Sequence, residues 1–147
     1  MSKSIYSKID KKEKRVYRKM YRKHRKEMIR LAKEDKDFDW SYLHDLVITK
    51  IRHMYEYYSN GDNVYQVDES RLQIVEQLKY VLDLQCELEH LYDNFSSAVI
   101  IENTDGSHSI CRDEESTKKL LATAERETLL YKEIYSYIGE YIQSWWD

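Results

Sequence analysis

The stretch DWSYLHDLVITKIRHMYEYYSNG, residues 39–61, decides the fold because it has the signals of a helix with two marked ends. Asp39 can accept hydrogen bonds from the amide groups of a first helical turn. Asn60 and Gly61 supply residues that tolerate the left-handed conformation in which helices often end. We therefore predict a helix over residues 39–60, about six turns long.

One face of this helix is apolar at steps of three and four residues, which predicts the side that packs into a core. The residues on it are Trp40, Leu43, Val47, Ile51, Met54 and Tyr58. Lys50 lies beside that face, and His53 and Tyr57 lie in its last turns. A core helix does not require these three side chains, so they are candidates for a site.

The composition around this helix predicts more helices. The chain has 147 residues with no proline and only three glycines, so it has few of the residues that interrupt helices. It also has fourteen tyrosines, whose rings suit interfaces and stacking on bases as well as ordinary packing. Its hydrophobic content of 41% and mean hydropathy of −0.81 are low for a monomer that must cover its own core. We expect one helical domain over 1–147 that associates with further copies of itself.

The segments on either side complete a mainly α fold, a four-helix antiparallel arrangement with long N- and C-terminal helices. We predict a basic helix over 1–35, a third helix over 68–95 and a C-terminal helix over 113–146. In residues 98–111, β-branched residues precede Asp105 and Gly106, a pair that favours tight turns between antiparallel strands. A small β-hairpin is therefore expected between helices three and four, with an irregular loop as the alternative.

The predicted C-terminal helix has apolar residues at alternating steps of three and four, as in a coiled coil. The line consists of Leu121, Ala124, Thr128, Tyr131, Tyr135, Ile138, Ile142 and Trp145. Such a line fits an interface with a second copy of the chain, and it equally fits burial in the chain's own bundle.

The N-terminal helix concentrates positive charge. Residues 1–30 contain thirteen Lys or Arg and three Asp or Glu, a net charge of +10, whereas the whole chain carries −3. Like charges at helical spacing destabilise an isolated helix by roughly 0.2–0.5 kcal/mol per pair, so an anion should offset them. The basic line on one side of this helix contains Lys11, Arg15, Arg18, Arg22 and Arg25.

Three anions fit this basic line. A nucleic acid would be held through its phosphates, with tyrosines between the arginines stacking on bases. A small phosphorylated ligand would be held between subunits by Arg15, Arg18, Tyr21, Arg22, Arg25, Lys50, His53 and Tyr57. The third anion is the chain's own acidic remainder, or an acidic partner protein.

The sequence offers no set of catalytic residues. It has no glycine-rich phosphate loop and no serine in a nucleophile-elbow context. Cys86, Glu87 and His90 supply two-ligand spacings at most, where a metal site needs three or four ligands. We expect no enzyme, metal or cofactor. The two cysteines lack a CxxC spacing and no long apolar run is present, so we expect a cytoplasmic protein without a membrane partner.

The central helix resembles a pattern found in small uncharacterised accessory proteins of tailed bacteriophages. The resemblance covers residues 38–95, and the residues that carry it are Trp40, Tyr42, Leu43, Lys50, Ile51, Met54, Tyr57, Tyr58 and Gly61. It implies a phage-encoded protein in the cytoplasm of the bacterial host, of the type that includes inhibitors of host defence. Some of those inhibitors are helical oligomers that sequester nucleotide signals.

These observations together predict a non-catalytic phage accessory protein, a helical homo-oligomer that binds a phosphate-bearing ligand such as a nucleotide signal of host immunity. Two alternatives remain open. The basic helix could bind nucleic acid independently of sequence, or it could dock on a host protein and inhibit it.

Overall fold

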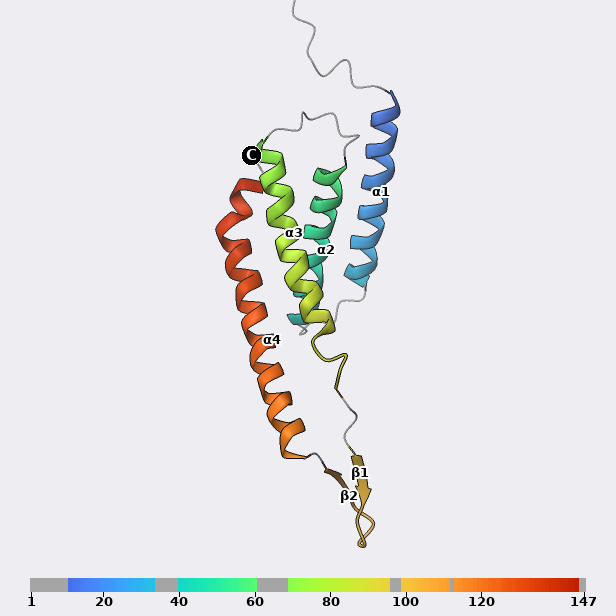
Figure 1. Cartoon of the computed structure of the whole chain (residues 1–147). Helices are drawn as coiled ribbons and strands as arrows, with labels where there is room; N and C mark the ends of the chain where they lie inside the picture. The colour runs from blue at the N-terminus through green and yellow to red at the C-terminus, as the bar shows by residue number, and fades with distance from the viewer. Residues whose placement is uncertain (1–10, 34–39, 61–68, 96–98, 112, 146–147) are drawn as a thin grey trace, which may run out of the picture. The chain divides into compact units, whose positions relative to one another are not determined.

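The computed structural model describes residues 11–33, 40–60, 69–95, 99–111 and 113–145. The elements are α1 (Lys11–Lys33), α2 (Trp40–Ser59), α3 (Glu69–His90), β1 (Val99–Glu102), β2 (His108–Cys111), α4 (Glu114–Tyr141) and the 3-10 turn η2 (Ile142–Trp145) (Figure 1). The predicted fold class is confirmed: the described chain is mainly α, with a two-stranded hairpin between the third and fourth helices. The chain divides into two compact units, Met1–Leu82 and Asp83–Asp147. The prediction of one helical domain stays a prediction.

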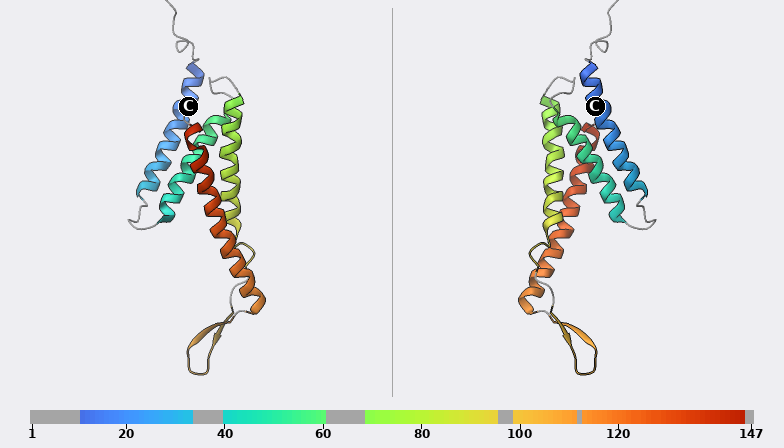
Figure 2. Two further views of the ribbon diagram at one scale, coloured as in Figure 1. Left: turned by 90° about the vertical axis from the view of Figure 1, so that its left-hand side faces the viewer. Right: turned by 90° about the vertical axis from the view of Figure 1, so that its right-hand side faces the viewer.

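In the first unit, α1 and α2 run side by side in opposite directions (Figure 2). On α1, Met20 is buried, and Val16 and Leu31 on the same side are half-buried. This apolar line is narrow. Polar and aromatic contacts with α2 therefore contribute a large share of what holds α1 in place.

The buried face of α2 differs from the predicted one. Trp40 and Leu43 are mostly exposed, whereas His44 and Ile48 are buried, and Ile51 is buried as predicted. A hydropathy pattern discounts histidine as a core residue, but a buried imidazole is tolerated when it finds a partner. The other buried imidazole of α2, that of His53, has such a partner in Glu27, 2.7 Å away, and the ring of His44 packs near that of Trp40, with centres 6.0 Å apart.

Arg71, in the first turn of α3, holds the C-terminal end of α2. Its Nε donates to the carbonyl of Tyr58 at 2.7 Å and its Nη2 donates to the carbonyl of Asn60 at 2.8 Å. The last carbonyls of a helix have no partner within it, so another group must satisfy them. Arg71 is itself buried, and these bonds use two of its five N–H donors. The predicted helix ends at Asp39 and Gly61 and the predicted start of the third helix at residue 68 lie outside the described residues.

In the second unit, the end of α3 and the turn after it pack against α4. Arg126 makes two bonds to Glu87, from Nε at 2.7 Å and from Nη2 at 2.9 Å. Further on, Lys119 lies over the ring of Phe95, 5.5 Å from its centre. Glu87 precedes Phe95 in the chain, whereas its partner Arg126 follows Lys119, the partner of Phe95. The two segments therefore pack antiparallel.

α4 begins at a well-formed cap, next to the predicted start of this helix at residue 113. Asp113 accepts a hydrogen bond from the backbone N–H of Ser116 at 2.7 Å, which satisfies one of the open amides of the first turn. The predicted apolar seam of α4 divides in two. Its inner part is buried, at Ile138 and Trp145, together with Leu130 and Ile134, whereas its outer part is exposed at Leu121, Tyr135 and Ile142.

The hairpin is confirmed, with the register Val99–Cys111 to Glu102–His108. Its turn is not of the primed type that Asp105 and Gly106 favour. That type needs positive φ at both central residues, but among the described residues the one with positive φ is Gly106, at 77°. Gly106 donates its N–H to the carbonyl of Asn103 at 3.0 Å, so the chain turns one residue earlier.

Candidate functional site

The outer face of α1 carries four arginines, Arg15, Arg18, Arg22 and Arg25, and all four are exposed. In the described part of the chain, no carboxylate lies within ion-pair distance of any of them. Their spacing puts them along one line of the helix, which extends over about 15 Å at 1.5 Å per residue. We call these four residues the arginine line.

Aromatic rings border the arginine line on one side. Tyr21 lies between the turns that hold Arg18 and Arg25, and 56% of its surface is exposed. Its ring stacks on that of Tyr17, with centres 6.4 Å apart and planes 19° apart. Tyr17 in turn meets Tyr57 of α2 edge to face, at 5.9 Å. This chain of contacts fixes the rings and leaves Tyr21 partly open to a stacking partner.

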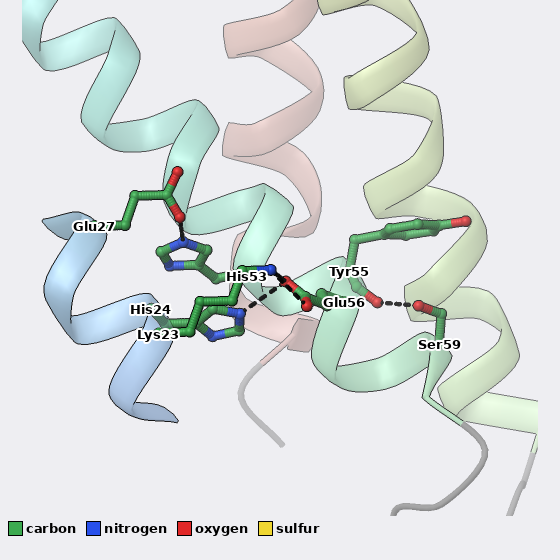
Figure 3. Close-up of polar contacts among 7 residues, drawn as sticks. All are labelled: Lys23, His24, Glu27, His53, Tyr55, Glu56 and Ser59. Carbon is green, nitrogen blue, oxygen red and sulfur yellow. Dashed lines mark hydrogen bonds and ion pairs between the residues drawn. The ribbon is translucent and has the colours of Figure 1, made fainter. Parts of the chain in front are cut away.

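The inner face of α1 is organised differently, because its ionisable groups have partners on α2 (Figure 3). Glu56 accepts from Nζ of Lys23 at 2.9 Å and from Nε2 of His24 at 2.9 Å. Nε2 of His53 donates to Glu27 at 2.7 Å. The rings of His24 and His53 stack between the two glutamates, with centres 3.9 Å apart and planes 5° apart.

These contacts shift the pKa values of the groups that make them. The hydrogen bond from His53 lowers the pKa of Glu27, and the bonds from His24 and Lys23 lower the pKa of Glu56. Burial lowers the pKa of His53, although the Glu27 carboxylate opposes that effect. At neutral pH both glutamates are therefore ionised, and the charge of His53 is disfavoured.

The two faces of α1 thus separate paired from unpaired charge. Glu27 and Glu56 are engaged by inner-face groups, so neither neutralises the arginine line. Sequence reasoning missed the pairs formed by His24 and Glu56 and by Glu27 and His53. Their spacing within each helix shows that each could face a neighbouring helix. Which residue of α2 meets which residue of α1 depends on how the two helices align, and the sequence of one helix does not show that.

The eight predicted ligand residues do not form one cluster. Arg15, Arg18, Arg22, Arg25 and Tyr21 share the exposed side of α1. On α2, Lys50 is exposed, whereas His53 is buried against Glu27 and Tyr57 is half-buried against Tyr17. Their assignment to a ligand site stays a prediction.

Within the described ranges, no group of three or more His, Cys, Asp or Glu is arranged to hold a metal ion. Among the same residues, no helix is both long and apolar enough to cross a membrane. In comparisons with protein-family models, curated proteins and solved structures, no match to the chain was found. The resemblance to phage accessory proteins stays a prediction.

Proposed function

We propose that the protein binds the phosphate backbone of nucleic acid through the arginine line, without reading base sequence. The observation that carries this proposal is the row of four exposed arginines, which no described carboxylate neutralises. Guanidinium groups bind phosphates through paired N–H donors, and such contacts release counterions whatever the sequence.

The geometry favours a polymer over a small ligand. The arginine line extends over about 15 Å along the outside of a helix, so its guanidinium groups meet successive phosphates more easily than they converge on one. Small-molecule sites are usually concave and bury most of the ligand. Tyr21 beside Arg18 and Arg25 adds a ring on which an unpaired base can stack, which favours single strands over duplexes.

The test is the salt dependence of binding. Fluorescence anisotropy with a labelled single-stranded oligonucleotide of mixed sequence should give a log affinity that falls linearly with log salt. Four phosphate contacts at about −0.7 each predict a slope of about −2.8. Arg18→Ala and Arg22→Ala should each reduce the slope by about 0.7. Lys79→Ala, which removes an exposed cation from α3, is the matched control and should leave the slope unchanged.

Other outcomes would overturn the proposal. A slope that neither arginine substitution alters would remove the arginine line from the interface. Tight binding of a mononucleotide or cyclic nucleotide, with no binding of the oligonucleotide, would favour the small phosphorylated ligand instead. Binding to an acidic protein that survives nuclease treatment would favour the docking alternative.

A further inference from the structure

The outward side of α4 carries large apolar side chains that the described chain does not cover. Leu121 and Leu129 are 61% and 54% exposed, and Tyr135 and Ile142 are about 40% exposed. Leu121, Thr128, Tyr135 and Ile142 are seven residues apart in succession, so they follow one line along the helix, the spacing of a coiled-coil seam. We call these four residues the outer seam.

Charged residues border the outer seam in an alternating order. These are Lys118, Glu125 and Lys132, which lie three positions before Leu121, Thr128 and Tyr135, on one side of the seam, and all three are exposed. Lys118 pairs with Glu114 one turn away, at 2.9 Å. In the described part of the chain, neither Glu125 nor Lys132 has an oppositely charged partner.

The order of these charges distinguishes the two ways in which a second α4 could pack on the outer seam. In a parallel pair in register the twofold axis runs along the helices, so the charged rows of the two copies lie on opposite flanks of the contact and do not meet. In an antiparallel pair centred between residues 128 and 129, each Glu125 lies opposite the other copy's Lys132. The pattern is therefore complementary to itself only in the antiparallel orientation.

Gly139 adds an independent observation on the same side of α4. It lies inside the helix, where glycine costs about 0.5–1 kcal/mol relative to alanine. No described atom of a neighbouring element lies within 4 Å of the place that a Cβ would take, so packing against the described residues does not explain the glycine. In the antiparallel register it lies opposite Lys118 of the other copy, where a missing side chain lets that lysine stem approach closely.

We propose that the outer seam of α4 binds the outer seam of a second copy of this chain in antiparallel orientation, with Glu125 of each copy paired to Lys132 of the other. The contact uses α4 and Ile142, the first residue of η2, and is independent of the arginine line. It makes the protein a homodimer whose twofold axis passes near Thr128.

The first test is the native mass in sedimentation equilibrium, which should be twice 17.9 kDa. Glu125→Lys places a lysine opposite Lys132 of the other copy, on both sides of the twofold axis, and should weaken the dimer about tenfold. The double variant Glu125→Lys with Lys132→Glu restores opposite pairs and should restore the dimer. Glu102→Lys makes the same charge change on the exposed hairpin and should have no effect.

The second test measures orientation with a short bis-maleimide cross-linker, in a background in which Cys86 and Cys111 are replaced by serine. Thr128→Cys should cross-link efficiently. Leu121→Cys should not cross-link, because the two copies of residue 121 would lie about 22 Å apart along the helix axis. A monomer, a dimer that Glu125→Lys leaves intact, or cross-linking at position 121 would each overturn the proposal.

Discussion

Replacing Arg71 by methionine should destabilise the first unit more than any other single change to a charged residue there. Arg71 is only 7% exposed, and its guanidinium donates to the carbonyls of Tyr58 and Asn60 at 2.7 and 2.8 Å. Hydrogen bonds from a charged donor contribute roughly 1.5–3 kcal/mol each. Methionine keeps much of the apolar stem but neither bond, so we expect a loss of about 3 kcal/mol in the free energy of unfolding.

The measurement is urea unfolding followed by far-ultraviolet circular dichroism. With a slope of about 2 kcal/mol/M, a loss of 3 kcal/mol lowers the midpoint by about 1.5 M. The urea midpoint of Arg71→Lys should lie between those of the unchanged protein and Arg71→Met, because an ammonium group does not reproduce the fork of two donors. Arg22→Met is the matched control: Arg22 is exposed and has no carboxylate partner among the described residues, so its replacement should change stability by no more than about 0.5 kcal/mol. Equal midpoints for Arg71→Met and Arg22→Met would refute the reasoning.

Three further predictions concern other parts of the chain. Acid should destabilise the α1–α2 contact in two stages. The pKa of His53 is lowered from 6.5, so as the pH falls the unfolded chain protonates this imidazole before the folded chain does, and the free energy of unfolding decreases below about pH 6.5. The pKa of Glu27 is lowered from 4.5, so the free energy of unfolding decreases again below about pH 4.5. His53→Gln should abolish the first stage alone in a pH series of urea midpoints. Asp113→Ala should cost about 1 kcal/mol through loss of the cap bond to Ser116, and Asp113→Ser should recover most of it in thermal melts. Ile134→Ala, at a fully buried position, should cost about 3 kcal/mol, whereas Ile110→Ala on the exposed strand should be nearly neutral in urea unfolding.

Much of the fold could be predicted because it depends on local signals. The absence of proline, the cap at Asp113 and the turn at Gly106 each act within a few residues, so the sequence shows them directly. The observed helices therefore lie within the predicted ranges, although α3 ends at His90 rather than near residue 95.

The predictions that went wrong depend on which elements meet. The apolar residues of α2 support two overlapping faces, and the one that is buried includes His44 and His53. Their burial is acceptable only in the presence of partners such as Glu27, which comes from α1. The basic line of α1 was visible in the sequence, because all its members belong to one helix. The pairing of Glu56 with Lys23 and His24 was not, since it depends on the alignment of two helices.

The short ribbon formed by β1 and β2 has a consequence for what else the protein can hold. A sheet of two strands has hydrogen-bonding groups along both outer edges, and here the cross-strand pair Ile100 and Ile110 leaves apolar surface exposed as well. An extended peptide from another molecule could therefore lengthen the sheet by one strand on either side. With four residues per strand, the ribbon would read only a peptide of similar length, and it would do so mainly through backbone groups.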